Sequence, residues 1–122
     1  MKHKIEQFTT YFDTQIAHCA EQEKRLIADA RKDEAIFEKI RANVYHIFRS
    51  IFGVAVDTCG ENAETVRDFF LKRVEHIPTS WHTTYETAKQ HDDVVKMQIE
   101  TTKLAVVQEI TAKFTEIWGD NA

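Results

Sequence analysis

The stretch that decides the fold is residues 36–56, IFEKIRANVYHIFRSIFGVAV. It has no proline and one glycine, and its apolar residues recur at intervals of three and four, which is typical of an α-helix. Large side chains, among them Tyr45, Phe48 and Phe52, occupy more than one face of that helix. A helix that is apolar around most of its circumference is usually surrounded by neighbours. We therefore expect the core helix of the protein over about residues 34–56.

The segment before this helix carries another apolar stripe with helical spacing. Its members are Ile5, Phe8, Phe12, Ile16, Cys19, Leu26, Ile27 and Ala30. The phase of the apolar pattern changes around Arg31, Lys32 and Asp33, which predicts a break between two helices, with Asp33 as the N-cap of the second. One continuous helix from the N-terminus to about Val56 is the alternative, because no glycine, proline or asparagine forces a stop at the break.

Turn signals follow the core helix. Gly60 suits the end of one helix, because glycine readily adopts the left-handed conformation found there, and Asn62 suits the start of the next. These residues predict a short third helix near residues 63–76.

The only proline of the chain, Pro78, comes directly after that third helix. We expect its ring to push Ile77 out of the helical conformation and so to end the helix. Thr79 or Ser80 can then accept a backbone N–H and begin a further helix. The sequence IPTS, residues 77–80, therefore predicts a tight reversal between two antiparallel helices.

The last third of the chain carries the longest apolar stripe. Its steps of three and four form a seam like that of a coiled coil, and its members are Trp81, Tyr85, Ala88, Asp92, Val95, Ile99, Thr102, Val106, Ile110, Phe114 and Ile117. As one helix, residues 80–118 would span ~58 Å, whereas the third helix spans only ~21 Å. The sequence predicts either a bend near QHDD, residues 90–93, or a long seam that the first helix or another chain covers.

This seam also predicts self-association. A second apolar row, made of Val94, Leu104 and Val107, widens it. Monomers rarely expose a contiguous apolar patch of more than a few hundred Å², and a two-fold dimer is the commonest way to cover one. We therefore expect a homodimer, and we expect Val107→Glu to shift it toward the monomer or toward aggregation. No residue pattern identifies any other protein partner.

The composition argues against several classes of protein. Sixteen basic and twenty acidic residues give a net charge of −4, so nucleic acid is not expected as a partner. A nucleic-acid-binding regulator that uses the face from Arg25 through Lys32 to Lys39 is an alternative, although acidic residues interleave with that face. The chain has no apolar run of ~18 residues that could span a bilayer. We expect no membrane segment and no secretory signal, and we expect a cytoplasmic protein with reduced cysteines.

Six histidines raise the question of a metal site. His82 and Glu86 are four residues apart and share a helix face, and His91 and Asp92 follow them, so a metal-binding or enzymatic bundle that uses these four residues is a second alternative. The motifs Glu-x-x-His and His-Glu-x-x-His, which build metal sites on helices, do not occur. We expect no metal, no cofactor and no catalytic site.

Three single residues have two interpretations each. Asp92 lies in phase with the apolar seam, where it could be a semi-buried acid or base, or a cap at a break in the helix, and the lack of a nearby nucleophile favours the cap. Cys19 lies on an apolar face, and we expect it to be buried rather than reactive. Cys59 lies in a turn sequence, and we expect it to be more exposed.

These observations predict an all-α protein that forms one domain over residues 1–122. We expect an antiparallel bundle of four principal helices with a long C-terminal helix. The function that fits this sequence is that of a small cytoplasmic helical protein acting through protein–protein contact, because no catalytic motif points to an enzyme.

Overall fold

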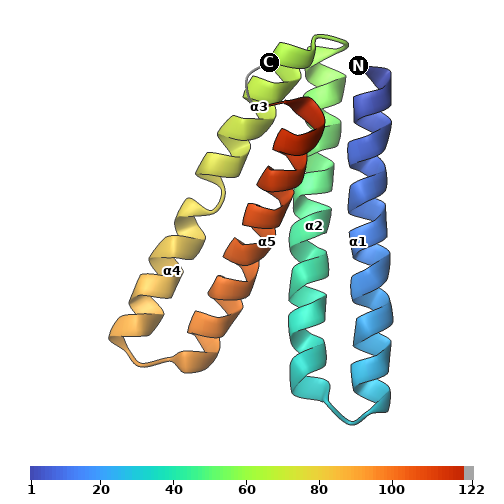
Figure 1. Cartoon of the computed structure of the whole chain (residues 1–122). Helices are drawn as coiled ribbons and strands as arrows, with labels where there is room; N and C mark the ends of the chain where they lie inside the picture. The colour runs from blue at the N-terminus through green and yellow to red at the C-terminus, as the bar shows by residue number, and fades with distance from the viewer. Residues whose placement is uncertain (120–122) are drawn as a thin grey trace.

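The structure of the chain is a computed structural model that describes residues 1–119. Within those residues 89% are helical and none lie in strands, so the predicted all-α class is confirmed. The helices are α1 (Lys2–Ala28), α2 (Lys32–Cys59), α3 (Ala63–His76), α4 (Thr79–Gln90) and α5 (Val94–Trp118). Figure 1 shows α1 and α2 as one antiparallel hairpin and α4 and α5 as another. The long C-terminal helix is α5, with 25 residues.

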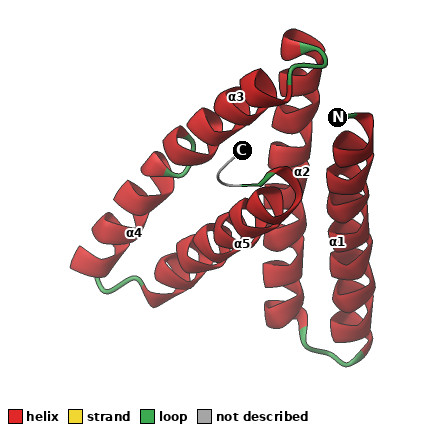
Figure 2. Cartoon of the chain, turned by 45° about the horizontal axis from the view of Figure 1, so that its top comes forward, coloured by secondary structure: helices red, strands yellow, loops and turns green. Residues whose placement is uncertain are grey.

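The predicted reversal at IPTS is wrong. The helices α3 and α4 follow one another in nearly the same direction, as a single broken arm (Figures 1 and 2). Ile77 keeps helical backbone angles, with φ −60° and ψ −43°, and its N–H donates to the carbonyl of Arg73 at 2.9 Å. Pro78 leads into the next helix, where its missing N–H costs nothing, and its carbonyl accepts from Trp81 at 3.0 Å. The proline therefore interrupts the helix without turning the chain, and the described residues form four principal columns.

The two reversals that build the hairpins lie elsewhere. The first is at residues 29–31, where Ala30 has φ +60°, so α1 and α2 are two helices rather than one. The prediction that Asp33 caps the second helix is wrong, because α2 begins at Lys32 with Arg31 as its N-cap. The second reversal is at residues 91–93, where Asp92 has φ +55° and Asp93 accepts the N–H of Lys96 at 3.1 Å. The last seam therefore breaks at QHDD.

The turn between α2 and α3 forms as predicted. Gly60 ends α2 with φ +63°, a region that glycine adopts at little cost. The side chain of Asn62 accepts the backbone N–H of Thr65 at 3.1 Å and begins α3. The third helix has the predicted bounds, and α2 continues past Val56 to Cys59.

A cluster of aromatic rings fills the end of the bundle where α1 begins and α5 ends, which we call the closed end. Phe8 is fully buried at its centre, with ring centroids 4.8 Å from Phe52, 5.5 Å from Phe70 and 5.3 Å from Phe114. Trp118 covers the cluster, and its indole N–H donates to the carbonyl of Ala63 at 3.0 Å. These rings bring α1, α2, α3 and α5 together.

At the opposite end the two hairpins diverge, and we call it the forked end (Figures 1 and 2). Its buried positions include the small residues Ala35 and Ala88. Ile27, on α1, is half exposed, and Val94 and Val95, on α5, are more than half exposed. The forked end therefore has apolar side chains but little core.

The C-terminal seam is covered inside the monomer over most of its length. Val106, Ile110, Phe114 and Ile117 are buried, and Val107 is only 8% exposed. The expectation that this seam forms the surface of a dimer is wrong, because α1, α2 and α3 pack against α5 and bury the seam from Val106 to Ile117. Val107→Glu should therefore destabilise the fold itself, since it would place a charge in the core.

Candidate functional site

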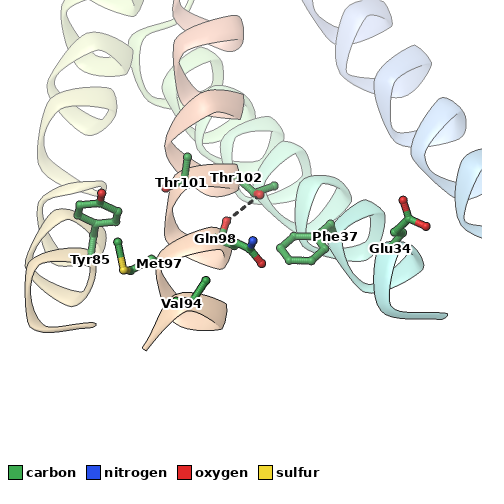
Figure 3. Close-up of a pocket in the computed structure, with 8 residues that line it drawn as sticks. All are labelled: Glu34, Phe37, Tyr85, Val94, Met97, Gln98, Thr101 and Thr102. Carbon is green, nitrogen blue, oxygen red and sulfur yellow. Dashed lines mark hydrogen bonds between the residues drawn. The ribbon is translucent and has the colours of Figure 1, made fainter. Parts of the chain in front are cut away.

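A hollow of about 580 Å³ lies on the forked end between α2, α4 and α5. We call it the fork hollow, and its lining residues are Glu34, Phe37, Tyr85, Val94, Met97, Gln98, Thr101 and Thr102. Figure 3 shows Met97 extending toward the ring of Tyr85 on one side, while Phe37 faces Gln98 on the other. The hollow exists because the two hairpins diverge at the forked end, so no further helix packs on these side chains.

The lining of the fork hollow provides a surface for contact but no catalytic group. The hydroxyl of Thr102 already donates to the carbonyl of Gln98 at 2.8 Å (Figure 3). Glu34 is bound by Arg31, and its hydrogen bonds from that guanidinium lower the pKa of the Glu34 carboxyl. The lining residues thus include no nucleophile paired with a base, which covalent or acid–base catalysis would need.

A second apolar surface runs along the outer face of α2. Ile36 is 54% exposed, Ile47 is 40% exposed and Val54 is 52% exposed. The steps between these positions are close to whole numbers of helical turns, so the three side chains lie on one line along the helix. We call this line the outer stripe. The expectation that neighbours surround α2 on most sides is wrong on this face, since α1, α3 and α5 all pack on the remainder of its circumference.

A polar network in the middle of the bundle connects α2 with α5. The hydroxyl of Tyr45, which is fully buried, donates to Oε2 of Glu109 at 2.7 Å, and Nη2 of Arg41 lies 3.4 Å from the same oxygen. Burial, together with the hydrogen bond to Glu109, raises the pKa of Tyr45 well above its usual value of 10. Burial also raises the pKa of Tyr11 beside it. Sequence reasoning assigned Tyr45 to the core and missed its polar partner, because Glu109 lies far away along the chain.

A buried carboxylate, Glu100, was also missed. It is 5% exposed, and its Oε1 accepts from Lys103 at 3.1 Å. Its Oε2 has no hydrogen-bond partner among residues 1–119. The ammonium of Lys103 lies 5.4 Å from the ring centroid of Trp81, so the pair ties α5 to α4. A periodicity analysis that follows apolar residues passes over such a position.

The residues of the metal alternative are not brought together. His82 and Glu86 are exposed on α4, His91 is the C-cap of that helix, and Asp92 is exposed in the following turn. Within residues 1–119, no three His, Cys, Asp or Glu side chains are grouped so that they could hold a metal ion. Asp92 is therefore a turn residue, and its neighbour Asp93 provides the cap.

The face from Arg25 to Lys39 is largely neutralised by acids. Arg25 lies 3.3 Å from Glu21, and Lys39 lies 3.9 Å from Glu23. Arg31 pairs with Glu34 and, at 3.8 Å, with Asp29. Lys32 is exposed at the start of α2. Binding to a phosphate backbone would have to compete with these ion pairs.

The two cysteines differ in environment as predicted. Cys19 is 2% exposed, and burial, followed by the nearby Glu38 carboxylate, raises the pKa of its thiol to about 11. Its thiol is therefore protonated at neutral pH, and it packs as a small apolar side chain. Cys59 is partly exposed at the end of α2.

Comparison of the chain with known protein families, with curated proteins and with solved structures found no match. Among the described residues, no helix combines the length and the apolar character that crossing a bilayer requires.

Proposed function

We propose that the protein acts through protein–protein contact and that it associates with itself as a homodimer. The observation that carries this proposal is the outer stripe, where Ile36, Ile47 and Val54 are aligned and the least exposed of them is still 40% exposed. Single exposed apolar residues are common on monomers, whereas an aligned row of them marks an interaction surface more often. The fork hollow adds the partly buried side chains of Tyr85 and Met97 on another face.

Light scattering on the purified chain tests the proposal. We expect a mass twice the 14.2 kDa of the chain at micromolar concentration. A folded species with the mass of a single chain that persists at millimolar concentration would contradict self-association.

A cytoplasmic location belongs to the same proposal. It is supported by the two free cysteines, one buried and one partly exposed, which the fold does not use as a disulfide. Mass spectrometry of protein that was alkylated under denaturing conditions during lysis should find the alkyl group on both cysteines, as expected for reduced thiols.

A further inference from the structure

The helix α4 is held in place by few buried side chains. Of residues 79–90, all of which the structure describes, only Ala88 is buried, whereas Trp81 and Tyr85 are partly buried. The helix lies along α5, and among residues 1–119 no other helix packs against it to a similar extent. The ring of Trp81 also meets that of Phe48 on α2, with centroids 6.4 Å apart. Less apolar burial therefore holds α4 than holds the helices of the closed end.

The sequence of α4 is also a weak helix former. It contains four threonines, whose branched side chains lose rotamer freedom in a helix. The hydroxyls of Thr83, Thr84 and Thr87 each donate to the carbonyl four residues earlier, at 3.2, 3.0 and 3.0 Å, a pattern that slightly destabilises a helix. The N-cap is Pro78, which makes no side-chain cap. Isolated helices of about twelve residues are marginal in water, so α4 depends on its contact with α5.

The face of α5 beneath α4 contains a carboxylate that gains from separation. Met97 extends toward Tyr85 of α4 (Figure 3), and Lys103 lies beside the ring of another α4 residue. Glu100 is midway between Met97 and Lys103 on one helix face, so that face is turned toward α4. Glu100 is 5% exposed there, and its Oε2 has no hydrogen-bond partner among residues 1–119. Water reaches this oxygen once α4 separates, which offsets part of the cost of opening.

Both ends of α4 are joints in the backbone. Pro78 has no N–H, so the hydrogen-bond ladder of α3 is interrupted where α4 begins. At the other end the chain turns at residues 91–93, where Asp92 has φ +55°. An extended residue spans about twice the length of a helical one, so α4 can unwind and leave α5 without pulling on either neighbour.

We infer that α4 is a lid that opens by local unfolding, while the aromatic core of the closed end stays folded. Opening removes one wall of the fork hollow, because Tyr85 belongs to α4. It also exposes the face of α5 that carries Glu100. Segments of low local stability are those that supply conformational changes in proteins. The motion takes place within one chain, so it does not depend on the proposed self-association.

Labelling of buried cysteines tests the lid. Ala88→Cys on α4 and Ala55→Cys on α2 are a matched pair, because these alanines are only 4% and 0% exposed. Both are made in the Cys59→Ser background, which keeps Cys19 as a buried internal control. At low maleimide concentration the rate of labelling follows the population of the open form. We expect the thiol at residue 88 to react at least about a hundredfold faster than the thiol at residue 55.

Low concentrations of urea separate local opening from global unfolding. Opening of α4 exposes little surface, so labelling at residue 88 should depend weakly on urea, whereas labelling at residue 55 and at Cys19 should accelerate steeply. Equal rates and equal urea dependence at residues 88 and 55 would overturn the inference, because α4 would then open only with the whole protein. If Ala55→Cys does not fold, Cys19 provides the same comparison within the Ala88→Cys variant.

Hydrogen exchange of the parent chain checks that the substitution does not itself create the motion. We expect the amides of residues 83–90 to exchange through an opening of lower free energy than those of residues 44–52 on α2. Glu100→Leu should slow the exchange of α4 about fivefold, because no carboxylate is then hydrated on opening. Equal opening free energies in α4 and α2 would contradict the lid, and unchanged exchange in Glu100→Leu would contradict the role of Glu100.

Discussion

The closed end and the forked end are built from the same long helices, yet only the closed end has a continuous core. At the closed end the ring centroids of Phe8 and Phe12 lie 4.6 Å apart, and those of Phe70 and Phe114 lie 4.7 Å apart. At the forked end the buried positions include alanines and Glu100, and the valines that begin α5 are exposed. Helical periodicity is similar at both ends, so the difference comes from side-chain size. Rings draw four helices together, whereas small residues let the two hairpins diverge.

The sharpest way to test this difference is to truncate one apolar side chain at each end to alanine. Phe70→Ala should lower the free energy of unfolding by ~3–5 kcal/mol, because it leaves a cavity among packed rings. Val95→Ala should lower it by less than ~0.5 kcal/mol, since that side chain is mostly exposed. Urea denaturation of both variants measures the contrast. Equal losses would mean that the forked end carries a core of its own.

The boundary between the two ends is marked by Tyr45, and its ionisation provides a second test. An unfolded chain loses the tyrosine proton near pH 10, while the raised pKa of Tyr45 keeps that proton in the folded chain. The contribution to stability is therefore complete below pH 10 and is lost as the pH rises above it. Relative to Tyr45→Phe, the parent chain should lose roughly 1.4 kcal/mol of unfolding free energy per pH unit above pH 10.

Urea denaturation of both proteins at pH 9, 10 and 11 measures that slope. The control is built into the comparison, because lysines and the other tyrosines titrate in both chains. Parallel pH profiles would show that Tyr45 ionises as easily in the folded chain as in the unfolded one.

The smallest expected effect concerns Glu100, the buried carboxylate between α4 and α5. Glu100→Leu should raise the free energy of unfolding by about 1 kcal/mol, because it removes an oxygen that has no partner among the described residues and fills the same space. Lys103 is partly exposed and can be solvated when its partner is lost. Glu100→Ala is the control and should be destabilising, since it leaves a cavity. Thermal melting that shows a loss for both variants would mean that the Glu100–Lys103 pair stabilises the fold.

Local chemistry could be predicted from the sequence where one residue determines the outcome. The cap by Asn62, the positive φ at Gly60 and the burial of Cys19 all follow from properties of those side chains. The direction of the chain after Pro78 could not be predicted, because a proline that starts a helix is compatible with both a kink and a reversal. Packing against α5 decides between them, and packing is not local.

The candidate surfaces were harder to predict than the helices. The C-terminal seam looked like the interface because its periodicity is regular, while the outer stripe of α2 is interrupted by Asn43 and Ser50. Which of two apolar stripes is buried depends on which helices meet, and only the structure shows that α2 and α1 lie beside α5. The network of Arg41, Tyr45 and Glu109 has the same origin, because it joins residues that are distant in the sequence.

The hairpins also determine the order in which the chain can fold. Within the α1–α2 pair and within the α4–α5 pair, partners are joined by turns of only three residues, so each pair closes a short loop at low entropic cost. The contact of α1 with α5, where Lys4 donates to the carbonyl of Trp118, joins the two ends of the described chain and closes a far longer loop. Helical proteins whose contacts are mostly local, like those within these two hairpins, fold in microseconds to milliseconds. The two hairpins should therefore form early, and the aromatic rings of the closed end should join them last.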